Sequence, residues 1–182
     1  MKKNLLIVAG LAFFMLLTRG SHVLTQVSLP DASLVLFLLG GLLLGRFAWF
    51  AAFFILATVI DFGAAAFDPA QGFCLTNGYW GLIPAYGTMW LGGVWLAKQK
   101  DAFNLVPYAL VSLATSFIAF VISTQTYYLF SGRFPAEGVV ESMQHGWEYL
   151  PSWMGFSMMY FAIAWLAVMA FRSIKALQTS KV

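Results

Sequence analysis

The stretch from 71 to 80, QGFCLTNGYW, holds Cys74, the only cysteine in the 182-residue chain. A single thiol cannot form an intramolecular disulfide, and it has no second cysteine for a CxxC redox or zinc motif. Free cysteine is often a small buried apolar residue, but here glycines would let the backbone approach a ligand and aromatic side chains would supply flat surface. The residues of this stretch expected to contact a ligand are Cys74, Asn77, Tyr79 and Trp80.

The number of ligands that the chain can offer limits the kind of metal it could bind. Structural zinc takes four protein ligands and catalytic zinc three, so Cys74 would need both His22 and His145 to converge on it from other segments. A metal held in a macrocycle needs only one axial residue, as haem does. We therefore expect no protein-built metal site, and Cys74 suits a corrinoid or a haem. Each histidine is an ordinary loop residue, a second axial ligand or a hydrogen-bond donor.

Asp61, in TVIDFGAAAF, is an acid inside an apolar run, roughly 9 Å from the end of that run at 1.5 Å per residue. Acids inside membranes usually face a cavity or a partner. Two interpretations stay open. Asp61 is a structural partner of Arg19, Arg133 or a tyrosine, or it accepts hydrogen bonds from a polar ligand on a cavity floor.

The elements that must position these residues are apolar. Hydrophobic residues make up 61% of the chain and charged residues 9%, with a mean hydropathy of +0.81, which is far from the soluble average. We predict a single transmembrane domain over 1–182, surrounded by the lipid bilayer. The ten Lys and Arg residues lie at the ends of apolar runs rather than on one face, so nucleic acid is not an expected partner.

Six apolar runs predict an all-α, polytopic membrane protein with six transmembrane helices. The runs are 4–19, 33–45, 47–67, 80–97, 103–130 and 149–171. The alternative joins 33–67 into one long helix, but we predict a hairpin that turns at Gly40, Gly41, Gly45 and Arg46. Cytoplasmic flanks carry excess Lys and Arg, and six helices place eight of the ten basic residues inside, whereas five helices place three. Both termini are therefore predicted to be cytoplasmic. The first run is expected to stay in the protein as a transmembrane helix rather than to be removed as a signal peptide.

This topology places both histidines and the cysteine in outer segments, at 20–32, 68–79 and 131–148. Long loops on a rigid scaffold commonly carry binding sites. The sequence contains no GxxxxGK[ST], HExxH or GxSxG motif, so ATP hydrolysis by this chain and standard protease or esterase chemistry are not expected.

A chain of this length, with six helices, both ends inside and aromatic outer loops, resembles the substrate-binding S-components of energy-coupling-factor (ECF) vitamin transporters. More narrowly, it resembles the BtuM family, the cobalamin-specific members of Gram-negative bacteria. The resemblance rests on His22 in RGSH, on Asp61, and on Cys74 with Tyr79 in FCLTNGYW. It implies cobalamin uptake across the bacterial inner membrane, with the binding face outside, Cys74 as axial ligand of cobalt, and Asp61, Tyr79 and His22 around the corrin.

Several expectations extend this resemblance. Arg133 and His145 are our own additions to the site. Because metal coordination favours the thiolate, Cys74 on cobalt would labilise the opposite ligand, such as cyanide, so decyanation is a hypothesis beside transport. The alanine-x-x-x-alanine docking motif is absent, since Ala9 and Ala12 are three apart, and both solitary action and coupling to an ECF-type transmembrane subunit with its ATPases stay open. Two other functions also stay open: a haem-binding redox or assembly protein, and a partner subunit in which Cys74 is incidental.

Overall fold

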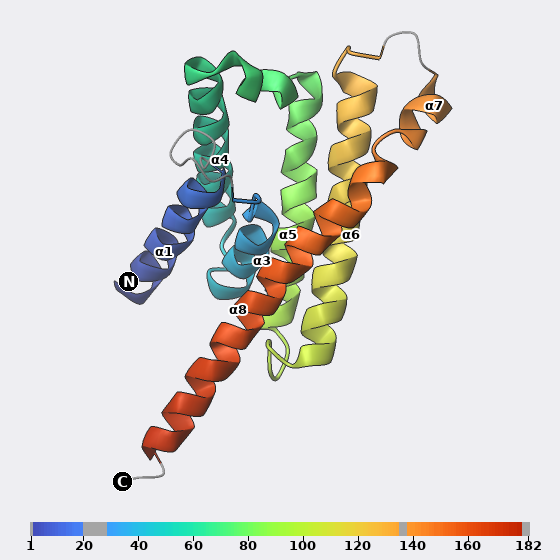
Figure 1. Ribbon diagram of the computed structural model, residues 1–182. Helices are drawn as coiled ribbons and strands as arrows, with labels where there is room; N and C mark the ends of the chain where they lie inside the picture. Colours follow the sequence, from blue (N-terminus) through green and yellow to red (C-terminus); the bar gives the residue numbers. More distant parts are fainter. Residues whose placement is uncertain (1, 20–28, 135–137, 180–182) are drawn as a thin grey trace.

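A computed structural model describes residues 2–19, 29–134 and 138–179 (Figure 1). Within these ranges the fold is all-helical, with 85% helix and no strands. The α-helices are α1 (Lys2–Arg19), α3 (Ser33–Leu43), α4 (Phe47–Phe67), α5 (Leu82–Ala97), α6 (Leu105–Phe130), α7 (Val139–Gln144) and α8 (Leu150–Thr179). Three 3-10 segments are η1 (Pro69–Cys74), η2 (Asn77–Gly81) and η3 (Trp147–Tyr149). The predicted all-α class is confirmed, and each of the six apolar runs overlaps one of the longer helices, although α1 begins before its run and α8 ends eight residues after its run.

The chain breaks between α3 and α4, as predicted for two helices rather than one. Gly45 has a φ of +66°, which glycine adopts without a Cβ penalty, and Arg46 is extended before α4 begins. The predicted turn was too wide, however, because Gly40 and Gly41 lie inside α3. A Cβ at either position would collide with Trp90 of α5, so these two glycines allow close helix packing instead.

Helix α3 forms the centre of the molecule. Val35, Leu36, Phe37 and Leu38 are at most 3% exposed, and the Phe37 ring stacks on Tyr86 of α5 at 4.3 Å between centroids. With 11 residues, α3 is about 16 Å long at 1.5 Å per residue, which is about half the thickness of a bilayer core. Helix α3 is therefore a short buried core helix.

Among the residues that the structure describes, three segments are long and apolar enough to cross a membrane: Phe47–Phe67, Leu105–Phe130 and Val139–Thr179, which includes α8. Asn4–Arg19 and Ser33–Leu43 are shorter apolar helices. Outward-facing residues of the long helices are apolar, including Ile55, Leu110 and Leu166, each about 60% exposed. Such faces suit contact with lipid, in agreement with a membrane protein.

The connections between helices gather at two ends of the molecule. Segments η1 and η2, and residues 131–134 and 138–149, lie at the upper end in Figure 1, which we call the η1 end. The α5–α6 connection, 98–104, lies at the other end, which we call the Lys98 end. There Arg172 of α8 donates two hydrogen bonds of 2.8 and 2.9 Å to Asp101. The cysteine and His145 thus share one end, as the helix count predicted.

Candidate functional site

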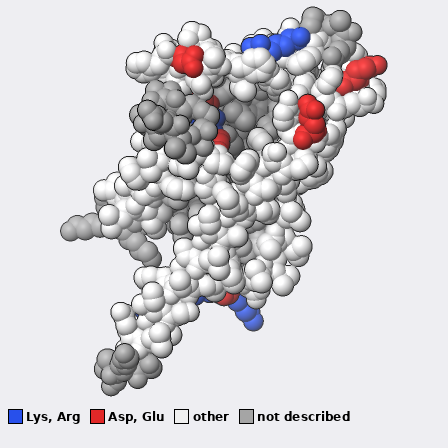
Figure 2. Space-filling view, in the orientation of Figure 1, with Lys and Arg blue, Asp and Glu red and all other residues white. Residues whose placement is uncertain are grey.

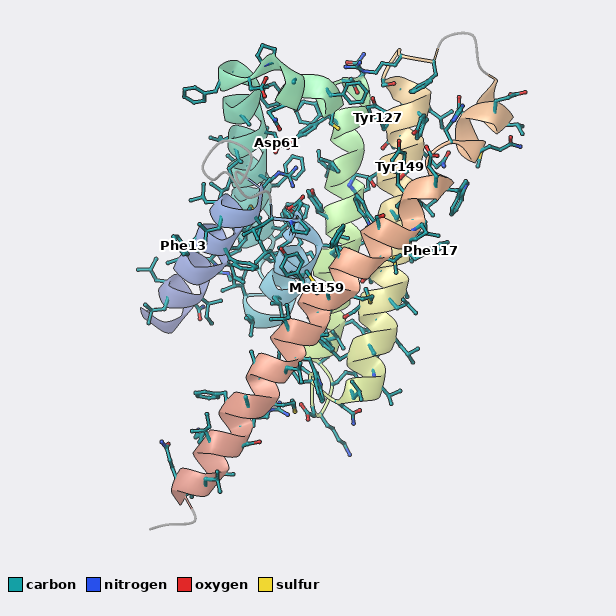
Figure 3. The ribbon with its side chains drawn as sticks, viewed as in Figure 1. Phe13, Asp61, Phe117, Tyr127, Tyr149 and Met159 are labelled. Carbon is teal, nitrogen blue, oxygen red and sulfur yellow. The ribbon has the colours of Figure 1, made fainter. Side chains whose placement is uncertain are left out.

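A cavity of about 400 Å³ lies at the η1 end, between the η1–η2 segment, α6 and the start of α8. Seven of its twelve lining residues are aromatic, so its walls suit a flat ring. Figure 3 shows Tyr127, from α6, and Tyr149, from η3, at this end of the bundle. The space-filling view is hollowed in the same upper region (Figure 2).

Cys74 is the last residue of η1 and lines this cavity. The start of η1 is fixed by Asp68, whose carboxylate accepts a hydrogen bond of 3.0 Å from the Ala70 N–H, a standard cap. Its other end is held by Arg133, which donates to the Phe73 carbonyl at 3.0 Å and lies 4.0 Å above the Phe73 ring. Arg133 therefore positions the loop that carries the thiol.

The environment of Cys74 keeps its proton on sulfur. The residue is exposed, yet surrounding protein atoms desolvate the thiol and raise its pKa, and Asp61 raises that pKa further, while Arg133 and Arg19 lower it. A thiol with a raised pKa is a weak nucleophile at neutral pH. A bound metal would displace the proton, because a coordinating thiol is deprotonated.

Two glycines bring η2 against α6. A Cβ on Gly78 would lie 2.6 Å from the Thr126 carbonyl oxygen, and one on Gly81 would collide with the Thr126 side chain. Glycine was predicted here to let the backbone approach a ligand closely, but in the structure Gly78 contacts the backbone of α6. This packing places Tyr79 and Cys74 on the same cavity as Tyr127.

Asp61 lies at the centre of a polar network between helices. Arg19 donates to both of its carboxylate oxygens at 2.6 Å, and Tyr79 donates its hydroxyl at 2.8 Å. Of the two interpretations offered for Asp61, the structure shows the protein partners, Arg19 and a tyrosine. Asp61 is absent from the lining of the 400 Å³ cavity, and its contact with a ligand stays a prediction.

Arg19 extends the network to a second, smaller cavity of about 190 Å³. It donates to the Tyr86 hydroxyl and the Ser33 hydroxyl, each at 2.7 Å, and to Asp31 at 3.1 Å. Tyr86 and Ser33 line the smaller cavity, Tyr79 lines the larger one, and Trp153 lines both. A series of hydrogen bonds, from Tyr79 through Asp61 and Arg19 to Tyr86, therefore connects the walls of the two cavities.

The remaining predicted site residues lie in different places. Asn77 and Trp80 are exposed, with Trp80 packed edge-on against Tyr79, and neither lines the cavity. His145 stacks on Tyr128, with 5.3 Å between ring centroids, but only Tyr128 lines the cavity. His22 lies outside the described residues.

The wall contributed by α6, η3 and the start of α8 was not predicted from the sequence. Tyr127, Tyr128, Tyr149 and Trp153 all line the cavity. The Tyr127 hydroxyl and the Trp153 indole N–H are buried, and neither has a hydrogen-bond partner within the described part of the chain. Buried donors without partners are uncommon, and these two lie on residues of the cavity wall, where a ligand acceptor would satisfy them. The paired tyrosines of QTYYLF, at the outer end of an apolar run, were the available signal.

Within 2–19, 29–134 and 138–179, no three His, Cys, Asp or Glu side chains lie together as a possible metal site. Comparison of the sequence with protein-family models and with curated proteins finds no match.

Proposed function

We propose that this protein binds a corrinoid and takes part in its uptake across the bacterial inner membrane, with the Cys74 thiolate as an axial ligand of cobalt. The observation that carries the proposal is the position of the only thiol, on the wall of an aromatic cavity at the η1 end. Cobalt bound in a corrin brings its equatorial ligands, so one soft protein ligand is sufficient.

The cavity wall offers what the ring and its side chains need. Aromatic side chains provide flat apolar surface, and the unpartnered Tyr127 hydroxyl and Trp153 N–H would donate to the carbonyl oxygens of corrin amides. A volume of about 400 Å³ is small among ligand pockets, which range from about 300 to 1,000 Å³. We therefore place only part of the corrinoid inside, with the rest over exposed Phe73 at the cavity mouth.

The proposed topology has six membrane-embedded helices, α1, α3, α4, α5, α6 and α8, in an S-component-like arrangement, with the η1 end outside and both termini cytoplasmic. It is supported by the basic residues at the Lys98 end, which is predicted to face the cytoplasm. These residues are Lys98, Lys100, Arg172 and Lys175. The short length of α3 is compatible with this arrangement because its sides are covered by protein.

Ligand exchange at cobalt follows from the same site. Coordination by the Cys74 thiolate on one face would weaken the bond to cyanide on the other, and cyanide would leave as the anion without any change in the oxidation state of cobalt. Arg133, held beside Cys74 through Phe73, would favour the thiolate electrostatically. ECF-type subunits and solitary action are both compatible with this proposal.

Growth of a cobalamin-dependent bacterial strain without its own uptake system tests the proposal. We expect wild type and Asn77→Ala to restore growth at limiting cobalamin, because Asn77 is exposed and off the cavity, and Cys74→Ala to restore it poorly. The colour of the purified protein separates the alternatives: a corrinoid spectrum supports the proposal, and a Soret band supports haem. If wild type is present in the membrane and fails to restore growth, uptake is refuted.

A further inference from the structure

A groove of about 510 Å³ runs between α5 and α6, away from the Cys74 cavity. These helices run side by side in Figure 1 and join at the Lys98 end. The α5 wall consists of Thr88, Leu91, Gly92 and Trp95. The α6 wall consists of Leu110, Val111, Ala114 and Thr115. Six of these eight residues are apolar or glycine, and α6 is long and apolar enough to cross a membrane, so the groove suits contact with the hydrocarbon of a bilayer.

The floor of the groove is closed by helix contact, and its two hydroxyl groups are bonded within their own helices. A Cβ on Gly92 would lie 2.8 Å from the Thr115 methyl group, so α5 and α6 are in close contact at the groove floor. Thr88 and Thr115 donate their hydroxyls to Pro84 and Val111 carbonyls of their own helices, at 2.9 and 2.7 Å. An acyl chain suits an apolar groove of this kind, and a second helix is the alternative occupant that the test below distinguishes.

The groove ends beside two unpaired lysines. Lys98 follows Trp95 by three residues in a continued helical turn, which places it on the same side of α5. Lys98 and Lys100 are exposed, and their side chains make no hydrogen bond or ion pair with any described residue. The acid of this connection, Asp101, is bound to Arg172. Figure 2 shows Lys and Arg atoms in blue at this lower end.

We propose that the α5–α6 groove is a binding site for an anionic phospholipid, with one acyl chain in the groove and the phosphate at Lys98 and Lys100. Basic residues beside a groove between transmembrane helices commonly bind anionic headgroups. Trp95, half-exposed between groove and lysines, lies where aromatic residues meet the headgroup region. This site does not depend on the corrinoid proposal.

Native mass spectrometry of the full-length protein in detergent tests the site. The probes are phosphatidylglycerol and phosphatidylcholine with identical acyl chains, and glycerol phosphate without chains. Ala114→Trp fills the groove from an exposed position, and Leu113→Trp adds the same ring outside it. Lys98→Gln with Lys100→Gln removes the basic end, and Lys175→Gln removes an exposed lysine elsewhere at that end.

We expect wild type, Leu113→Trp and Lys175→Gln to prefer phosphatidylglycerol. The two-lysine variant should lose a preference of roughly 30-fold at low salt, because each lysine near an anionic lipid contributes a factor of about five. Ala114→Trp should bind neither lipid at this site. Equal binding of both lipids by wild type, equal binding of glycerol phosphate, or unchanged binding by Ala114→Trp would overturn the proposal. The proposal would also be overturned if wild type were a dimer and Ala114→Trp were the only variant to dissociate it, because the groove would then bind a second copy of the chain.

Discussion

Replacing Asp61 with asparagine tests whether the polar network stabilises the fold at the site. The change preserves the size of the side chain but removes the charge that faces Arg19. In the structure, Arg19 is only 9% exposed along its side chain and donates two 2.6 Å hydrogen bonds to Asp61. Its guanidinium would remain buried with Asp31 as its remaining acidic partner.

Removing one member of a buried ion pair typically costs about 3–5 kcal/mol. We take the lower end, about 3 kcal/mol, because Asp61 is 20% exposed and Asp31 stays 3.1 Å from Arg19. In a protein of this size each kcal/mol of lost stability lowers the midpoint of thermal unfolding by about 2–4 °C. The expected fall in the unfolding midpoint of Asp61→Asn is therefore roughly 6–12 °C.

Thermal unfolding of the detergent-solubilised protein, followed by tryptophan fluorescence, measures this loss. Asp101→Asn is the matched control, because its ion pair with Arg172 is exposed at the opposite end and exposed pairs stabilise a protein less than buried pairs do. Arg19→Met combined with Asp61→Leu should destabilise less than the sum of the two single changes, because no buried charge is left unpaired. Additive effects, or equal midpoints for Asp61→Asn and Asp101→Asn, would refute the reasoning.

Three further predictions concern packing, pH and thiol reactivity. Gly78→Ala should lower the free energy of unfolding by about 2 kcal/mol, because the added methyl group overpacks against the α6 backbone. Gly155→Ala, with open space around it, should raise the free energy of unfolding by about 0.5–1 kcal/mol. Equal unfolding midpoints for the two variants would contradict this. Hydrogen bonds from Arg172 and the Phe103 N–H lower the Asp101 pKa to about 2, so its stabilisation is present above the unfolded pKa and is lost as pH falls toward 2. The midpoints of wild type and Asp101→Asn should therefore converge in acid, and parallel curves would disprove it. Maleimide should label Cys74 slowly at neutral pH because the pKa of this thiol is raised. Arg133→Gln should slow the labelling further, because it removes a charge that lowers the same pKa. Faster labelling of Arg133→Gln than of wild type would contradict this prediction.

The helices could be predicted from the sequence because each apolar run is bounded by glycine, proline or charge. The width of the α3–α4 turn could not be predicted. Gly40 and Gly41 signal a turn or close packing equally well, and only the position of Trp90 on α5 distinguishes these roles. The partner of Asp61 likewise depended on which arginine approaches through space, and the sequence left Arg19 and Arg133 open.

The site was predictable along η1 and η2 but not across the cavity. Within η2, successive side chains of a 3-10 helix point about 120° apart, so turning Tyr79 inward leaves Asn77 and Trp80 exposed. The sequence motif does not contain that geometry. Tyr127 and Trp153 come from helices far along the chain, and tyrosine or tryptophan near a helix end is also typical of a membrane interface.

The absorption spectrum of cyanocobalamin bound to the purified protein tests the central claim most directly. With wild type, coordination of the Cys74 thiolate to cobalt should shift the absorption bands away from those of free cyanocobalamin. With Cys74→Ala, any bound cyanocobalamin should keep the spectrum of the free vitamin. If both proteins bind cyanocobalamin and give the same spectrum, Cys74 is not a ligand of cobalt and the account is contradicted.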